Sequence, residues 1–164
     1  MSTTPEVRYF DYVNAGYERV RDMLRNDALA VCRAATKTAA SRAATLASEL
    51  HVNVGGVEIG TDVTIKLTDV EERAADVKSP RATTFSLEWE AARRPRLFPL
   101  MHAKLAVYPL TATETQLELV SRYDPPLGVI GAAVDALVGH RIADATVHRF
   151  LNDVAAHLRQ TLAK

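Results

Sequence analysis

The last quarter of the chain constrains the fold more than any other part. An alternating segment, TQLELVSRY, leads into the turn DPPLG at 124–128, and a proline-free run follows from 129 to 164. Alternation of apolar and polar residues is typical of a strand with one buried face, and a long amphipathic run without proline is typical of a helix. This order predicts an antiparallel sheet closed over by its own C-terminal helix, and we expect any function to lie in the cavity between the two.

Apolar side chains of the C-terminal run fall on one side of the expected helix. With each residue advancing by about 100°, they form one broad stripe, and Arg141, Asn152 and Asp153 lie largely opposite. The stripe consists of Ala133, Ala136, Leu137, Ala143, Val147, Phe150, Leu151, Val154, Ala155, Leu158 and Leu162. A stripe of this width is typical of a helix that covers a core.

Short alternating segments separated by turn residues precede this helix. The pair Gly55-Gly56 indicates a tight hairpin, because glycine adopts positive φ at little cost, and the side chain of Asn26 or Asp27 can cap a helix. Antiparallel sheets with one solvated face show this alternation, so the predicted fold class is α+β. We expect six antiparallel strands at about 6–13, 44–54, 57–70, 82–91, 98–109 and 114–123, with helices near 16–24, 27–41 and 127–162.

The same alternation predicts which strand side chains face the helix. A register shift of one residue would expose every apolar side chain at once, so the two faces should be sharply distinguished. We expect these side chains to be buried toward the helix: Leu50, Ile65, Leu87, Met101, Leu105 and Leu119. We expect these to be exposed on the other face: Glu49, Lys66, Glu88, Lys104 and Glu118.

Length and composition suit a single domain spanning residues 1–164. The chain has 164 residues, 48% of them hydrophobic, and two domains would each have a marginal core. Lys plus Arg and Asp plus Glu both total 20, and this balance argues against nucleic-acid binding, which needs a basic surface. Cys32, the only cysteine, lies in an apolar helical pattern and is expected to be a buried, inert thiol.

The sequence lacks the signals of export and of membrane insertion. Its N-terminus, MSTTPEVRYFDY, has neither the charged start nor the long apolar core of a signal peptide. No window approaches the ~18 consecutive apolar residues of a membrane span. We therefore expect a cytoplasmic protein without a membrane span.

The order of elements resembles that of the START-like superfamily, also called helix-grip, Bet v 1-like or SRPBCC, which includes polyketide cyclases, plant allergens and lipid-transfer domains. The residues that carry the resemblance are the RYDPPLG turn, the LEWEA strand, the LFPLMHAKLAVYPL strand and the two helices after the first strand. It covers nearly the whole chain. It implies a curved six-stranded sheet wrapped around the C-terminal helix, with an apolar pocket for a hydrophobic small molecule. The superfamily holds both binders and enzymes.

Two polar residues interrupt the apolar stripe of the terminal helix, namely His140 near its centre and Asp144 one turn later, and His148 lies at its margin. Spaced at i, i+4 and i+8, their side chains lie along one face. A carboxylate beside an imidazole can orient a ligand or act as an acid/base pair. Alternatively, His140 and Asp144 bond each other or nearby backbone. We expect no metal site, because no Cys or clustered Glu completes a ligand set.

Further candidates lie on the expected inner face of the strands. Trp89 can stack on a flat ligand or belong to the core. Tyr123 and Ser121 can offer hydroxyls to a ligand or form hydrogen bonds at the strand end, and Met101 and Leu105 supply apolar lining. No G-x-S-x-G, Walker or Rossmann glycine motif is present, which disfavours serine hydrolases, P-loop enzymes and dinucleotide enzymes.

The leading hypothesis is a non-enzymatic binder of a hydrophobic small molecule, such as a lipid or polyketide, without a cofactor. Its specificity would come from shape, with His140, Asp144, Tyr123 and Trp89 as polar or aromatic anchors. One alternative is a cyclase or dehydratase with His140 as general base and Asp144 orienting it. Another is an interaction module whose cavity is filled by its own side chains. The oligomeric state stays open, with a homodimer among the alternatives.

Overall fold

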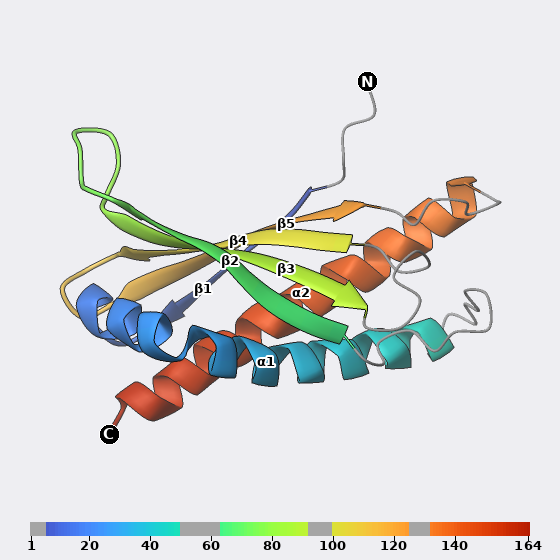
Figure 1. Ribbon diagram of the computed structural model, residues 1–164, viewed down its shortest axis with the longest axis horizontal. Helices are drawn as coiled ribbons and strands as arrows, with labels where there is room; N and C mark the ends of the chain where they lie inside the picture. The colour runs from blue at the N-terminus through green and yellow to red at the C-terminus, as the bar shows by residue number, and fades with distance from the viewer. Residues whose placement is uncertain (1–5, 50–62, 92–99, 125–131) are drawn as a thin grey trace.

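The computed structural model describes residues 6–49, 63–91, 100–124 and 132–164, which form an antiparallel sheet with two long helices on one of its faces (Figure 1). The elements in chain order are β1 (Glu6–Val13), α1 (Tyr17–Glu49), β2 (Val63–Arg73), β3 (Ala82–Ala91), β4 (Leu100–Pro109), β5 (Thr115–Asp124) and α2 (Ala132–Leu162).

The strands are arranged in the order β1-β5-β4-β3-β2, and every neighbouring pair is antiparallel. Strands β2 to β5 follow one another as a meander, and β1 pairs with the free edge of β5. Helix α2 packs against β1 and β5, α1 packs against β2 and β4, and the two helices pack against each other. The predicted α+β helix-grip architecture, with a terminal helix against the inner face of the sheet, is confirmed.

Burial follows the alternation along the strands. In β5, Leu117, Leu119 and Ser121 are buried, whereas the residues between them belong to the outer face. The inward orientation predicted for four of the apolar residues is confirmed, since these are buried: Ile65, Leu87, Leu105 and Leu119. Leu50 lies outside the described residues, as does the side chain of Met101.

The outer face carries the charged side chains, as the register predicts. Lys66 and Lys104 are exposed. Full exposure is wrong for Glu88 and Glu118, which are half-buried because neighbouring side chains cover them. Glu118 forms an ion pair with Arg8 at 3.2 Å, and Glu88 lies 3.3 Å from the ring of His102. The side chain of Glu49 lies outside the described part of the chain.

The predicted strand at 44–54 is wrong in its first half, where α1 continues to Glu49. The described residues therefore form five strands rather than six. The segment 44–49, ATLASE, does alternate, but it is rich in alanine and leucine, which favour helix, and no proline or glycine separates it from the preceding helix. Residues 50–54 and the Gly55-Gly56 hairpin lie outside the described residues.

Helix α1 has a kink where the sequence predicts a boundary between two helices. Asp27 has φ of −127° and ψ of 20°, which lies outside the helical range, so that α1 consists of two helical segments joined at this residue. Asn and Asp side chains bond nearby backbone groups in non-helical conformations and so compete with the helix. The second segment extends beyond its predicted end at 41.

The core lies between the sheet and the helices. Its largest fully buried side chains come from strands and helices alike: Phe85, Phe150, Leu24, Leu105, Leu117, Leu119, Leu151, Leu158, Val13, Val20, Val107 and Val154. Four of these belong to the predicted stripe of α2. The predicted burial of Cys32 is confirmed, and burial raises the pKa of its thiol to about 12. A thiol with this pKa is a poor nucleophile at neutral pH.

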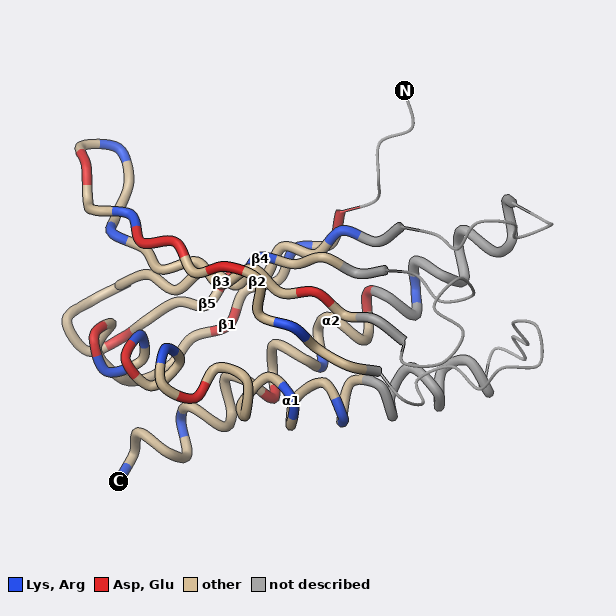
Figure 2. Tube along the Cα trace, in the orientation of Figure 1, with Lys and Arg blue, Asp and Glu red and all other residues tan. Residues whose placement is uncertain are grey.

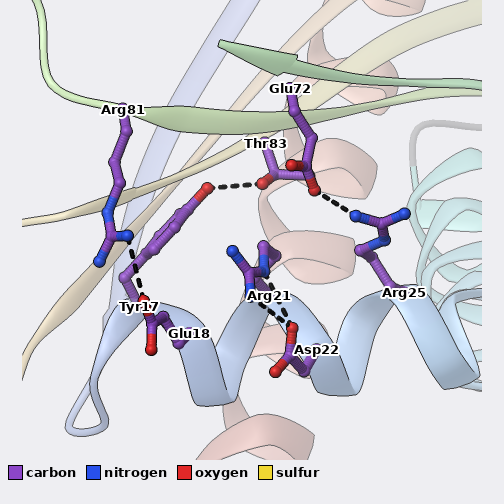
Figure 3. Close-up of polar contacts among 8 residues, drawn as sticks. All are labelled: Tyr17, Glu18, Arg21, Asp22, Arg25, Glu72, Arg81 and Thr83. Carbon is purple, nitrogen blue, oxygen red and sulfur yellow. Dashed lines mark hydrogen bonds and ion pairs between the residues drawn. The ribbon is translucent and has the colours of Figure 1, made fainter. Parts of the chain in front are cut away.

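Polar contacts fix the first turns of α1 against β2 and β3 (Figure 3). The hydroxyl of Tyr17 lies 2.6 Å from that of Thr83, and both residues are buried. The guanidinium of Arg81 lies over the Tyr17 ring, 4.5 Å from its centroid, and forms an ion pair with Glu18 at 3.1 Å. The burial of both residues therefore shields the Tyr17–Thr83 hydrogen bond from water.

Replacing Tyr17 by Phe should lower the free energy of unfolding by about 1–2 kcal/mol, because the hydroxyl of Thr83 would remain buried without its partner. Urea denaturation followed by circular dichroism measures the change. Tyr12→Phe is the matched control, since Tyr12 is half exposed on the outer face and its substitution should change stability by less than about 0.5 kcal/mol. Equal effects of the two substitutions would contradict the assignment.

Candidate functional site

The inner face of the sheet has small side chains in one cross-strand row and large ones in the next. The strand register places Ser121 opposite both Val7 and Ala103, and Ala103 opposite Leu87. The adjacent row consists of Tyr9, Leu119, Leu105 and Phe85. Ser121 and Ala103 thus provide less volume at the middle of the sheet than the leucines beside them, and both are buried.

Trp89 connects this inner face to both helices. Its indole N–H donates a hydrogen bond to Oγ1 of Thr36 in α1 at 3.0 Å. Its ring meets Phe150 of α2 edge to face, with the ring centroids 5.0 Å apart. Edge-to-face contacts of this kind favour one ring orientation. The half-buried indole is therefore held in a defined position, one pleat away from the Ala103 row.

Ser121 has a polar group that no described residue satisfies. Its side chain is 1% exposed, and its hydroxyl has no hydrogen-bond partner among the described residues. The other three buried polar side chains of the described chain are partnered, Thr36 by Trp89, Thr83 by Tyr17 and Thr115 by the carbonyl of Ala15. A buried hydroxyl without a partner costs about 1–3 kcal/mol, so it is an unusual feature of a folded core.

A second polar cluster connects β1 to α2. The carboxylate of Asp144 lies close to the hydroxyl of Tyr9, and the Tyr9 ring stacks on the imidazole of His148 with centroids 4.8 Å apart. Burial, together with hydrogen bonding to Asp144 and its negative charge, raises the pKa of Tyr9 to about 12. Tyr9 therefore keeps its proton well above neutral pH and presents its O–H to the carboxylate as a donor.

The structure brings together part of the predicted site. Trp89, Leu105 and Ser121 lie on the inner face, and Asp144 is half-buried on α2. Met101 pairs with both Trp89 and Tyr123 in the sheet, but the side chains of Met101 and Tyr123 lie outside the described part of the chain. His140 lies one turn before Asp144 in α2, and its side chain also lies outside the described part. The acid/base pair of His140 and Asp144 stays a prediction.

Four residues of the site were missed by the sequence reasoning: Tyr9, Thr36, Ala103 and Phe150. Tyr9 could have been found, because it follows Val7 at the next inward position of a predicted strand. Ala103 and Phe150 were recognised as inward or core residues, but their packing around a site depends on the register of the sheet. Thr36 gives no signal of its own, and its bond to Trp89 depends on how α1 crosses the sheet.

Other features of the described chain are less suited to a site. No three His, Cys, Asp or Glu side chains of the described residues are grouped as metal ligands would be. Charges of both signs are intermixed over the strands and helices (Figure 2). An open depression of about 360 Å³ lies near the β4–β5 turn, and no predicted site residue lines it. Within the described ranges, neither helix has the length and apolarity needed to cross a membrane.

The sequence matches no protein-family model and no curated protein. Three solved structures are similar over nearly their whole length. The Zhui aromatase/cyclase from Streptomyces sp. R1128 is 12% identical, with a TM-score of 0.49 and coverage of 98% of this chain and 96% of the other. A START superfamily protein from Mycobacterium smegmatis is 9% identical, with a TM-score of 0.43 and coverages of 95% and 98%. Ara h 8.0201 is 4% identical, with a TM-score of 0.44 and coverages of 95% and 98%.

The helix-grip description itself rests on this chain's own sheet order and on the packing of α2 against β1 and β5. Identities of 4–12% carry no information on which ligand a chain of this fold binds.

The contact between Tyr9 and Asp144 predicts the titration of Tyr9. At a pH of about 10.5, at which an ordinary tyrosine is largely ionised, Tyr9 should remain protonated in the folded protein, as NMR of the tyrosine ring carbons can measure. The folded state holds this proton more tightly than the unfolded state, so the contribution to stability is present below pH 10.0 and is lost as the pH rises to about 12.

Asp144→Asn should lower the pKa of Tyr9 while leaving it above 10.0, because burial, the largest cause, remains. Asp153→Asn is the control, since Asp153 is on the same helix but pairs with Arg149 at 3.1 Å. An ordinary midpoint for Tyr9 in the folded wild type, or equal shifts in the two variants, would contradict the contact.

Proposed function

We propose that this protein binds a hydrophobic small molecule between the inner face of its sheet and the C-terminal helix, at the row formed by Ser121 and Ala103. Leu87 lies opposite Ala103 and Leu105 lies at the next inward position of the same strand, while Phe150 of α2 packs on Trp89 nearby; all three are buried and apolar. Ligand sites of this type combine mostly apolar walls with a few polar groups that fix orientation. Their specificity comes chiefly from shape.

The hydroxyl of Ser121 is the observation that carries the proposal. An alanine at this position would have the same backbone and nearly the same volume without the cost of an unpartnered hydroxyl. A ligand that bonds this hydroxyl removes the cost, so that the energy appears as binding affinity. Trp89 supports the same reading, because its ring is already oriented by Thr36 and Phe150 and loses little freedom when a flat or branched ligand packs on it.

The residues predicted from the sequence define the extent of the proposed site. Ser121, Leu105 and Trp89 would contribute from the inner face, and Met101 and Tyr123 from the strand positions next to Trp89. His140 and Asp144 would border it from α2. Asp144 is half-buried and lies close to the Tyr9 hydroxyl, so a ligand there would meet a carboxylate that already has a neighbouring donor.

The alternative is an enzyme, a cyclase or dehydratase that uses His140 as general base at the same position. Experiment must distinguish this enzyme from a binder without activity. The raised pKa of Tyr9 makes that residue a hydrogen-bond donor and a poor base, and no described contact favours turnover over binding. His140→Ala distinguishes the two. Loss of turnover with retained binding would indicate an enzyme, and weakened binding without any turnover would indicate a binder.

Binding can be measured with Nile red, a neutral dye whose emission changes in apolar surroundings. Trp89 is the only tryptophan, so energy transfer from the protein to the dye reports proximity to this residue alone. Native mass spectrometry of the freshly purified protein should in addition find a small molecule that travels with it. Dye binding without energy transfer would place the dye elsewhere and contradict the proposed position.

Ala103→Leu should abolish Nile red binding because the added side chain fills the space beside Ser121. The matched control is Ala106→Leu, on the outer face of the same strand, which should bind the dye as the wild type does. If this space is empty in the free protein, Ala103→Leu will keep the wild-type stability or exceed it. A loss of about 1–3 kcal/mol, as overpacking causes, with no dye bound by the wild type, would instead indicate the interaction module with a filled interior.

A further inference from the structure

We propose that the bound molecule is uncharged where it is buried and carries a single hydrogen-bonding oxygen there, as an apolar alcohol or ketone does, and that this oxygen bonds the hydroxyl of Ser121. The inference rests on the proposed function and names its ligand class. An acid or an amine of the same shape would be excluded by the charge of its head group.

The described strand positions of the inner face offer no unpaired charge to a charged head group, since Asp11 on β1 pairs with Arg159 and Glu72 on β2 pairs with Arg25. The buried polar side chains of the described residues are all neutral hydroxyls: Thr36, Thr83, Thr115 and Ser121. None of the described inward positions of the five strands is Lys or Arg. A carboxylate or ammonium group placed there would lose its hydration without gaining a partner of opposite charge, and that loss is far larger than one hydrogen bond to serine can return.

Among the described side chains of α2, a carboxylate lies near this row. Asp144 lies close to Tyr9, which is two residues from Val7 on β1, and Val7 pairs with Ser121. A half-buried carboxylate in this position repels an anionic ligand, and partial burial weakens the screening of that repulsion by water. Long-chain acids are therefore disfavoured twice, by desolvation of their own charge and by the charge of Asp144.

One oxygen is enough because the neighbouring polar groups of the described residues already have partners. The indole N–H of Trp89 donates to Thr36, and the hydroxyl of Tyr9 faces the carboxylate of Asp144. The hydroxyl of Ser121 can donate one hydrogen bond and can also accept. An alcohol group can accept a hydrogen bond from Ser121 or donate one to it, and a ketone oxygen can accept one. A ligand with several buried polar groups would leave most of them unpaired.

Ala103 makes the hydroxyl accessible to such an oxygen. It lies directly opposite Ser121 on β4, and its methyl group is the smallest side chain that a chiral residue can place there. The larger neighbours Leu87 and Val7 complete the row on either side. An oxygen that bonds Ser121, with the apolar chain extending from it along the sheet, matches this distribution of volume.

A series with one chain length and different head groups tests the ligand class. Decanol, 2-decanone, decanoate, decylamine and decane would each compete with bound Nile red at neutral pH. Decanol and 2-decanone should displace the dye at concentrations at least about tenfold lower than decanoate or decylamine, because only the latter two bury a charge. Decane should bind about three- to tenfold more weakly than decanol, a difference that corresponds to one hydrogen bond.

Ser121→Ala should remove the difference between decanol and decane while leaving the affinity for decane unchanged. Its stability without ligand should equal or exceed that of the wild type, since it removes an unpartnered group. Ser86→Ala, a serine on the outer face of β3, is the matched control and should keep the decanol preference. The stability measurement shows that a loss of preference does not come from misfolding.

Two results would overturn the inference in distinguishable ways. If Nile red binds and decanoate competes as well as decanol, or if Ser121→Ala keeps the preference for decanol, the ligand class is wrong and the proposed function stands. If neither the dye nor any member of the series binds, the proposed function fails as well. Strong preference for decylamine would indicate that Asp144 receives a cation, and would also overturn the neutral class.

Discussion

Burial of a single apolar face of the sheet is the constraint on which the rest of the structure depends. A five-stranded antiparallel sheet alternates its side chains between two faces, and here the face with Leu105, Leu117 and Leu119 must be removed from water. Neither helix covers it alone, since α2 packs against β1 and β5 and α1 packs against β2 and β4. The two helices therefore also pack against each other, and the kink at Asp27 divides α1 within this arrangement.

An apolar interior of this kind accepts polar groups only in pairs. Tyr17 with Thr83, Trp89 with Thr36, and Thr115 with a backbone carbonyl each join two elements that are distant in sequence, so that hydrogen bonds fix how the layers meet. The exception among the described residues is Ser121, whose hydroxyl lies opposite the small side chain of Ala103. The coincidence of a small neighbour with a missing partner is the reason for proposing this row as the binding position.

The sequence was sufficient for the features that depend on local periodicity. The bounds of β1 and β3, the inward positions of Leu87 and Leu119 and the apolar stripe of α2 follow from alternation and from helical spacing. It failed at 44–49, where alternation and helix propensity conflict and the growing helix gains a hydrogen bond with each added residue. Periodicity shows which side of a segment is apolar, but it does not distinguish a helix from a strand when both conformations satisfy the pattern.

The candidate site was only partly predictable because its contacts depend on packing between distant elements. The interruption of the α2 stripe by Asp144 was visible, yet its partner Tyr9 is on the edge strand, 135 residues earlier in the chain by residue number, and becomes a neighbour only because α2 packs against β1. The same holds for Trp89 and Thr36. Under the proposed function, stability and binding would depend on different rows of one sheet: the leucine row holds the layers together, whereas the Ser121 row would receive the ligand. Substitutions in the second row would then change the ligand without changing the fold.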